Sequence, residues 1–548
     1  MMHFKLITSA RLLLMAAAVA ALSACGGGGG GGGGGTSTGT GSTGGGTTGW
    51  VSGVFQAAST FKSKCETVRT GLDIEGNRYT DTQGTATDEK NWLRSWTNET
   101  YLWNTEVTDT NPASGGTRTA YFATLKTLAK TASGKDKDEF HFSESTADYL
   151  ARRNAAATAS YGMELTAISN TIPRDFRILY TEPGSPAAGV VPRGARIMKV
   201  NDVSLVSDGT QAGVNVLNAG LFPTSAGTST KFEFQLVDGT TKTVTLVSAN
   251  VTPKAVNTTA VLDQSGSKVG YILFNTFSPY ASESEIIAAM QQMQTSGVTD
   301  LVLDLRYNGG GLLAVASQLS YMIAGSTRTT NKTFERLRFN AAAGTRNPVT
   351  GETNSPVPFY STGLGFSAPS GSALPALNLS RVFILSTADT CSASEAVING
   401  LRGIGVEVVL VGGKTCGKPY GFYPQDNCGE TYYTVQFQGV NELGFGDYAD
   451  GFVPLNTTET SGVKLSGCVA SDDLNHALGN SGEGLLSTAL TYRRTSACPT
   501  TASASLLAVT KAVQSDSASV GGSGAAIELP DKWIMALNRD MTMPGGTH

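Results

Sequence analysis

The sequence predicts a multi-domain α/β protein, and three observations lead to this fold class. The chain has 548 residues, which is long enough for two to four domains. From about residue 255, apolar β-branched runs alternate with helical patterns, as in a sheet covered by helices. Residues 158–250 instead show short strand patterns separated by turns. We therefore expect a β-rich domain over 158–250, an α/β core over 255–500 and a C-terminal tail over 501–548.

The N-terminus has the features of an export signal. Lys5 and Arg11 form a positive region, an apolar run follows to residue 22, and small residues precede Cys25. The LSAC sequence at 22–25 resembles a bacterial lipoprotein signal, which implies cleavage of residues 1–24 and lipidation of Cys25. An ordinary signal peptide with a chance cysteine is the less favoured alternative. We expect a protein of the cell envelope that is lipid-anchored to a membrane, with the outer membrane favoured, and that faces the periplasm or the cell surface.

A glycine-, serine- and threonine-rich tract occupies residues 25–49 and is typical of a flexible tether. The region over 50–155 is predicted to be a helical domain because Trp92, Trp96 and Trp103 recur at helical spacing. Another short helix is predicted over 121–128. His141 could be functional, but a packed or surface histidine is the favoured interpretation.

The composition narrows the classes of function. The net charge of −4 and the absence of a basic stripe argue against nucleic-acid binding. No cysteine or histidine spacing indicates a metal, and we expect no cofactor. Six cysteines remain after Cys25, and an even number in an exported protein suggests disulfides. The predicted pairs are Cys416 with Cys428, and Cys468 with Cys498.

The β-rich region carries a recognisable sequence pattern. Residues 161–165 read YGMEL, residues 184–189 read GSPAAG, and residues 194–201 read GARIMKVN. This order resembles a PDZ domain. The resemblance places Tyr161, Gly162, Met163 and Glu164 at the loop that captures a peptide's C-terminal carboxylate with backbone N–H groups, while the peptide adds as a strand.

The α/β core alternates strands and helices. A buried strand at 301–306 ends in the glycine turn YNGGG at 307–311, and residues 340–375 form an irregular excursion. Expected strands cover 269–274, 382–385, 406–411, 431–438 and 451–454, and expected helices cover 282–293, 393–401, 483–492 and a segment ending near 323.

The segment from residue 382 to residue 418 suggests a chemistry. Ser392 lies on a strand-to-helix turn, and Lys418 follows in a glycine-rich loop. A serine hydroxyl needs a base, and a buried lysine can be neutral enough to serve as one. The N–H groups at a helix start can stabilise an oxyanion. A helix-capping serine with an unrelated lysine is the alternative interpretation.

Taken together, the chain resembles the carboxyl-terminal processing peptidases, bacterial serine proteases with a PDZ domain beside a Ser/Lys core. The resemblance covers roughly residues 155–460 and depends on the PDZ pattern, on DLRYNGGG at 304–311, and on SASE at 392–395 with Gly417 and Lys418. It implies that Ser392 is the nucleophile and Lys418 the general base. It also implies an oxyanion hole from the N–H of Ala393 and of Gly309 or Gly310.

The sequence departs from this family's pattern after the lysine. Many members have a glutamine four residues later, where this chain has Phe422. Others have an aspartate about eleven residues after the serine, where this chain has Arg402 and Gly403. The third group is therefore unidentified, and Ser392 with Lys418 is the predicted dyad. Cys391 and Cys416 beside the dyad suggest an exported subfamily with a disulfide-braced site.

Two functions follow. The favoured one is an endopeptidase that acts on polypeptide substrates, holding their unstructured C-termini with its PDZ domain. The alternative is a non-catalytic, peptide-binding lipoprotein on a protease-like fold. An esterase that uses His141 or His476 is less favoured because no GxSxG elbow surrounds Ser392.

Overall fold

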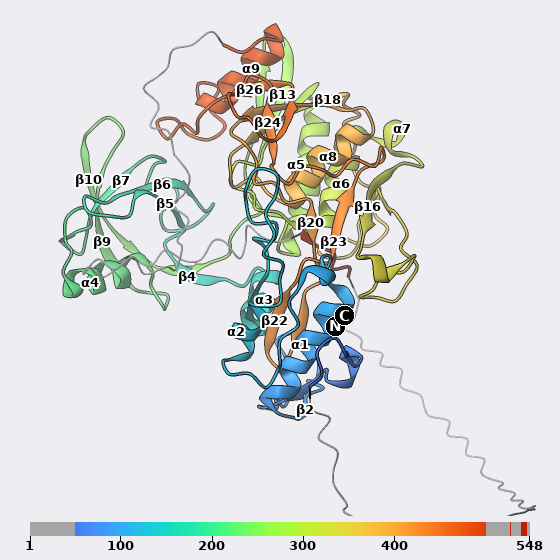
Figure 1. Cartoon of the computed structure of the whole chain (residues 1–548). Coiled ribbons are helices and arrows are strands. Elements are labelled where there is room, and N and C mark those ends of the chain that lie inside the picture. Colours follow the sequence, from blue (N-terminus) through green and yellow to red (C-terminus); the bar gives the residue numbers. More distant parts are fainter. Residues whose placement is uncertain (1–49, 500–526, 528–538, 545–548) are drawn as a thin grey trace, which may run out of the picture. The chain divides into compact units, whose positions relative to one another are not determined.

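The computed structural model describes residues 50–499, 527 and 539–544 (Figure 1). The predicted signal segment, the lipidation residue Cys25, the tether and most of the predicted tail lie outside the described residues. Within the described ranges, none of the helices combines the length and the apolar character needed to cross a bilayer.

A six-stranded sheet forms the centre of the α/β core. Its strand order is β12-β13-β14-β18-β19-β26, and all neighbours are parallel except β12 with β13. The strands span Val256–Gln264, Ser267–Phe274, Asp300–Asp304, Arg381–Ser386, Glu407–Gly412 and Gly467–Val469, respectively. The predicted strands at 269–274, 301–306, 382–385 and 406–411 are confirmed within one or two residues at each end.

Successive residues of a strand point to opposite faces of a sheet, and here the residues on both faces are apolar. Helices therefore cover both faces. Val382 and Ile384 of β18 pack into one core with helices α5, α6 and α8, whereas Phe383 and Leu385 pack into a second core with α9. These helices span Ala281–Ser296, Leu313–Ala324, Ala393–Gly403 and Gly484–Thr495. The mixed α/β class is therefore confirmed.

Residues 158–251, called here the β-rich region, contain a separate antiparallel sheet. Its order is β10-β9-β7-β6-β5, with β8 (Val203–Ser204) paired to β7. Leu217 and Leu221 of α4 (Gln211–Leu221) pack into the core of this sheet. The strands β4 (Thr158–Ser160) and β11 (Ala249–Val251) pair with each other where the chain enters and leaves the region. In chain order, β5, β6, β7, β9 and β10 span Met163–Ser169, Asp175–Thr181, Arg196–Val200, Ser229–Gln235 and Thr241–Val247.

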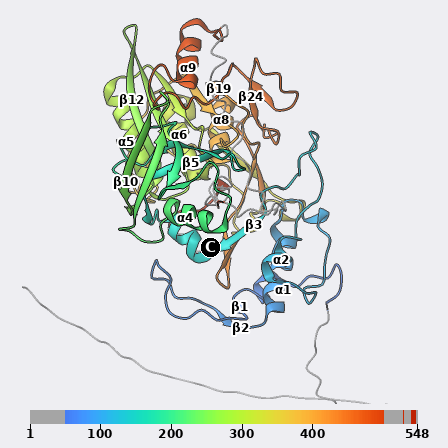
Figure 2. The same ribbon diagram turned by 90° about the vertical axis from the view of Figure 1, so that its left-hand side faces the viewer.

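The N-terminal region is less helical than predicted. Its α-helices are α1 (Ala86–Thr100), α2 (Arg118–Phe122) and α3 (Thr146–Arg153), and most other residues form loops. The aromatic spacing was a correct signal for α1, because Trp92 and Trp96 stack and are buried. Helices α1 and α2 lie near β1 (Lys64–Cys65) and β2 (Thr82–Gln83) in both views (Figures 1 and 2). The residues between these helices were predicted to be helical but form loops. They do so because polar and glycine-containing stretches separate the short apolar segments.

One small sheet joins the N-terminal region to the core, and a second small sheet lies within the core. Strand β3 (Phe142–Ser145) pairs with β22 (Glu430–Tyr433), which pairs with β21 (Gln425–Asn427). Another sheet has the order β17-β16-β23-β20, from Val357–Pro358, Thr333–Arg338, Phe437–Val440 and Tyr420–Gly421. The remaining short elements of the described residues are β15 (Gly311–Leu312), β24 (Phe452–Pro454), β25 (Val463–Leu465), β27 (Arg539–Asp540), α7 (Ser326–Thr329) and three 3-10 turns at Ala58–Thr60, Asn104–Glu106 and Ala341–Ala343.

Of the two predicted disulfides, the structure contains one and contradicts the other. Cys468–Cys498 is present, but Cys416 pairs with Cys391, and Cys428 pairs with Cys65. The prediction of Cys416 with Cys428 is therefore wrong. Short spacing along the chain favoured it, whereas the fold brings Cys65 to Cys428 across 363 residues.

Candidate active site

Ser392 occupies a strained turn at the carboxyl end of a central strand. β18 ends at Ser386, and α8 begins at Ala393 directly after the serine. The backbone of Ser392 has φ +61° and ψ −110°, a conformation that costs free energy for a residue with a side chain. Such strain is typical of functional residues. The residue is fully buried, as are the neighbouring turn residues Cys391 and Ala393.

Lys418 comes from the loop after the adjacent parallel strand β19. Gly417 precedes it with φ +87°, and a Cβ at this glycine would lie 2.2 Å from the Ala449 carbonyl oxygen, so the loop requires glycine. The Lys418 side chain is buried, with its Nζ 4.0 Å from the ring centre of Phe422 and 5.0 Å from that of Phe140. Burial holds the pKa of Lys418 well below its usual range, although the charges of Asp138 and Glu395 oppose this shift.

Glu395 joins the serine turn to the lysine loop. Its Oε2 accepts hydrogen bonds from the backbone N–H of Ser392 (3.0 Å) and of Lys418 (2.8 Å). Its Oε1 accepts from the Gly417 N–H (2.9 Å) and the Thr415 hydroxyl (2.5 Å). Burial raises the pKa of Glu395, and these hydrogen bonds oppose the rise. The single carboxylate therefore fixes the spacing of the two backbones that carry Ser392 and Lys418.

The glycine turn after β14 is attached to the serine turn through Asn308. The Asn308 carbonyl oxygen accepts from the Cys391 N–H and from the Ser394 hydroxyl, both at 3.0 Å. The Asn308 side chain in turn accepts from the Gly310 N–H at 2.9 Å. Direct hydrogen bonds thus bring together the two segments that were predicted to form the oxyanion hole, the glycine turn after β14 and the serine turn.

These bonds select between the two candidate glycines. The Gly310 N–H is already used by Asn308, so Gly310 is not a ready oxyanion donor in this conformation. Among the described residues, the N–H groups of Gly309 and Ala393 donate to no acceptor. An N–H pair with no internal acceptor next to a serine hydroxyl is the arrangement that an oxyanion needs. As donors to an oxyanion, the N–H groups of Gly309 and Ala393 are therefore better suited than those of Gly310 and Ala393.

The disulfide between Cys391 and Cys416 makes a covalent link between the same two segments. Cys391 precedes the serine, and Cys416 lies two residues before the lysine. Glu395 lies between them, and Glu89 lies similarly beside Cys65 and Cys428. These two groups have the residue types of metal sites, but disulfide sulfurs are not thiolate ligands, so neither group holds a metal in this state.

Removing the Cys391–Cys416 disulfide should impair activity more than removing the Cys468–Cys498 disulfide. Replacing both Cys391 and Cys416 with Ala is expected to lower the free energy of unfolding by about 3 kcal/mol, because a loop of this length gains that much entropy when unfolded. The double variant Cys468→Ala/Cys498→Ala is the control, since the sequence separation that its disulfide closes is similar, 30 against 25 residues. Melting curves should show similar losses for both pairs. Peptide cleavage should fall markedly only for the first pair, and equal cleavage rates would contradict a bracing role.

The structure shows what occupies the positions where the family pattern fails. Phe422 presents its ring to Lys418, so it contributes burial and not orientation by hydrogen bonding. Arg402 stacks over Phe445 and Phe452. Asp138, whose charge acts on Lys418, accepts a hydrogen bond from the Tyr101 hydroxyl at 2.7 Å. Sequence reasoning missed Asp138, because it lies some 280 residues before the lysine and no local motif marks it.

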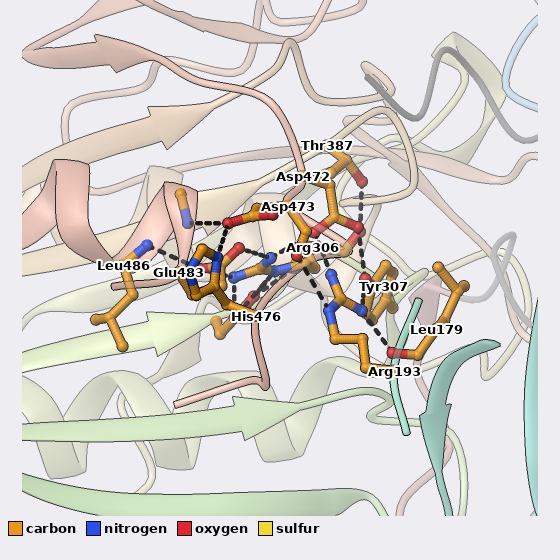
Figure 3. Close-up of polar contacts among 12 residues, drawn as sticks. Leu179, Arg193, Arg306, Tyr307, Thr387, Asp472, Asp473, His476, Glu483 and Leu486 are labelled. Carbon is orange, nitrogen blue, oxygen red and sulfur yellow. Dashed lines mark hydrogen bonds and ion pairs between the residues drawn. The ribbon is translucent and has the colours of Figure 1, made fainter. Parts of the chain in front are cut away.

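The two histidines that the structure describes, His141 and His476, make no hydrogen bond to Ser392 or Lys418. His141 is packed against Phe122, as favoured from the sequence, and its Nε2 lies 2.9 Å from the Phe122 carbonyl oxygen. Burial lowers its pKa to about 4, so it is neutral at physiological pH. His476 pairs with Asp473 in a second polar network (Figure 3).

That network joins the β-rich region to the strand leading into the glycine turn (Figure 3). Arg193 donates to the Tyr307 hydroxyl at 2.7 Å and pairs with Asp472. Asp472 also pairs with Arg306, which is fully buried. Arg306 further pairs with Asp304 and Glu483. These contacts hold residues 304–307 in place, immediately before the turn that carries Gly309.

The predicted peptide-binding residues lie in the β-rich region and not in the Ser392 cluster. The Tyr161 hydroxyl is buried and donates to Thr230 at 2.7 Å. The Gly162 N–H donates to the Ser160 hydroxyl at 3.0 Å. Met163 and Glu164 begin β5, the last strand in the order of the described sheet.

Comparisons with known proteins agree with this architecture. Residues 268–422 match the sequence model of peptidase family S41. A carboxyl-terminal-processing protease of Picosynechococcus sp. is 32% identical over 151 residues, covering 26% of this chain and 34% of that protein. The chain therefore spans about a third of the length of this curated relative. A crystal structure whose name assigns it to the S41 proteases, from Bacteroides fragilis, is 25% identical with a TM-score of 0.55, covering 74% of this chain and 97% of that one.

The matched segment contains every residue of the Ser392 and Lys418 cluster that comes from the α/β core. Within residues 268–422 the chain is therefore similar to peptidase family S41, and the curated relative and the solved structure are both named as proteases. These similarities support a peptidase, which is a hydrolase, as the class of protein.

Proposed function

We propose that the chain is a serine endopeptidase that cleaves exported or unfolded proteins near their C-termini with Ser392 and Lys418. The observation that carries the proposal is the attachment of both backbones to Glu395, with the lysine amine buried between two aromatic rings. This arrangement provides a hydroxyl on a strained turn and an amine whose charged form is disfavoured. Both are needed for a serine nucleophile with a lysine base.

The reaction follows from these positions. Neutral Lys418 takes the proton of the Ser392 hydroxyl as Oγ bonds to the scissile carbonyl carbon. The oxyanion forms hydrogen bonds with the N–H groups of Gly309 and Ala393. Lys418 then gives its proton to the departing amine as the C–N bond breaks, which leaves an acyl ester on Ser392. Lys418 next takes a proton from a water as that water attacks the ester carbon, and it returns the proton to Ser392 Oγ as the C–O bond breaks, which releases the acid and restores the serine.

The β-rich region is proposed to act as a PDZ domain that selects substrate C-termini. Its support is the sequence pattern at 161–201 together with the antiparallel sheet and the α4 helix packed on it. In this mode a peptide adds as a strand beside β5, and backbone N–H groups near Tyr161 and Gly162 hold its carboxylate. The internal bond from the Gly162 N–H to Ser160 would have to be exchanged for the peptide.

Amidating the substrate's C-terminus should slow cleavage. An amide lacks the negative charge that the loop at 161–164 is proposed to bind, so we expect a several-fold lower kcat/KM, mainly through a higher KM. A matched pair of peptides with free and amidated ends, compared by mass spectrometry, measures this directly. Equal values for the two peptides would show that the β-rich region does not select carboxyl termini.

The membrane location is proposed from the sequence of residues 22–25, which lie outside the described residues. Cys25→Ser should prevent acylation and move the protein from the membrane fraction to the soluble exported fraction. The control is a substitution in the same segment that keeps the cysteine, such as Gly30→Ser. A Cys25→Ser protein that stays with the membranes would contradict lipid anchoring.

A further inference from the structure

A short segment near the end of the chain pairs with both loops that flank the candidate active site. Strand β27 (Arg539–Asp540) is parallel to β15 (Gly311–Leu312), with Asp540 opposite Leu312. Asp540 also forms a bridge with Phe422, and the Met541 N–H donates to the Phe422 carbonyl oxygen at 3.2 Å. The predicted tail is therefore docked on the core at residues 539–542.

The two partners of this segment are direct neighbours of the proposed chemistry. Gly311 is two residues after Gly309, the proposed oxyanion donor. It also contacts the Phe277 backbone so closely that a Cβ would lie 2.3 Å from it. Phe422 presents its ring to the Lys418 amine at 4.0 Å. The backbone of the segment takes up strand-pairing groups of both loops, and groups of this kind are the ones by which an extended peptide binds as an added strand.

Two side chains of the segment are buried near helix α3. Asp540 and Thr542 are both buried, and the Asp540 Oδ1 accepts from the Thr542 N–H (2.7 Å) and hydroxyl (2.5 Å). Burial raises the pKa of Asp540, and the cations of Arg152 and Arg153 on α3 oppose the rise. The Asp540 carboxylate is thus hydrogen-bonded within the segment and lies in the field of two arginines of α3.

The C-terminal part of the chain also contacts the β-rich region, which is proposed above to bind peptides. Ile527 is half-buried against the hydrophobic core of the β-rich region. The C-terminal part of the chain thus contacts both the β-rich region and the rim of the Ser392 site.

We propose that the surface formed by β15, Phe422 and α3 is a strand-accepting peptide site, and that residues 539–542 of this same chain occupy it. The ligand class is an extended polypeptide with a carboxylate side chain followed two positions later by a hydroxyl, as in Asp540 and Thr542. The inference rests on the proposed peptidase function and deepens it. The segment competes with substrate for the same backbone groups, and Ser392 and Lys418 are both buried while it is bound.

The test uses the full-length chain with Ser392→Ala, so that no cleavage intervenes. Met541→Pro removes the N–H that bonds to Phe422 and should release the segment, whereas Met541→Ala keeps that N–H. A fluorescent peptide with the sequence of residues 536–544 is titrated into each protein. We expect at least tenfold tighter binding to the Pro variant than to the Ala variant. A peptide carrying alanine in place of Asp540 should bind several-fold more weakly.

Equal peptide affinity for the Pro and Ala variants would overturn the proposal, provided that melting curves show both to be folded. If the Pro variant does not fold, Asp540→Ala in the full chain replaces it, because this change removes the bonds to Thr542 while leaving the backbone unrestricted. With Ser392 intact, the releasing variant should have a lower KM, and the free peptide should inhibit it competitively. Absence of cleavage by every variant, with the binding difference retained, would defeat the proposed function and leave the peptide site standing.

Discussion

Ser392→Ala is expected to reduce the cleavage of an unfolded protein by at least about 10³-fold, because alanine has no oxygen to form the acyl ester. Binding should survive, since the substitution removes one buried oxygen and keeps the turn. Ser487→Ala on helix α9 is the matched control, because its hydroxyl bonds only within that helix. The measurement is mass spectrometry of fragments from a reduced, alkylated substrate protein.

Retained cleavage by Ser392→Ala would remove the serine from the role of nucleophile. Tight peptide binding by the unsubstituted chain without any cleavage would instead favour a non-catalytic, peptide-binding lipoprotein. These two outcomes are distinguishable because the first concerns rate and the second concerns affinity.

Lys418→Arg is expected to be as inactive as Lys418→Ala. Arginine keeps its proton at all ordinary pH values and cannot accept one from the serine, although it preserves the positive charge. Lys414→Arg, in the same loop, is the control, because Lys414 is partly exposed and bonds to Ser461. Assays of kcat/KM for the four proteins would measure the difference, and near-normal cleavage by Lys418→Arg would contradict the base role.

The lowered pKa of Lys418 also sets the direction of the pH dependence. Below that pKa the amine is protonated and cannot act as a base, and above it the amine is neutral. The value of kcat/KM should therefore rise with pH through a pKa well below that of an ordinary lysine and then level off. His141 should add no further step, because burial keeps it neutral above about pH 4.

Much of the core could be predicted because its strands are buried on both faces. Continuous β-branched runs such as residues 382–385 and 406–411 have few alternatives to a parallel sheet. Adjacent parallel strands end at the same edge, so the turns after β14, β18 and β19 had to converge. The proximity of the glycine turn, Ser392 and Lys418 follows from that topology.

The remaining features depend on contacts between distant parts of the chain. Asp138 reaches Lys418 from the N-terminal region, and Cys65 reaches Cys428 across most of the sequence. Neither contact leaves a local pattern. The choice of Gly309 over Gly310 depends on one side-chain bond from Asn308, which glycine spacing cannot reveal. Glu395 did carry a signal, since a glutamate three residues after a helix cap suggests a capping box, but its bonds to the lysine loop required the fold.

The central claim is that Ser392 is a nucleophile activated by neutral Lys418, and covalent labelling tests it most directly. The full-length chain is treated with a fluorophosphonate over a range of pH, digested and mapped by mass spectrometry. The account predicts a single modified residue, Ser392, with a labelling rate that rises as Lys418 loses its proton and is abolished by Lys418→Arg. Labelling at another serine, or equal labelling of Ser392 in the Lys418→Arg protein, would contradict it.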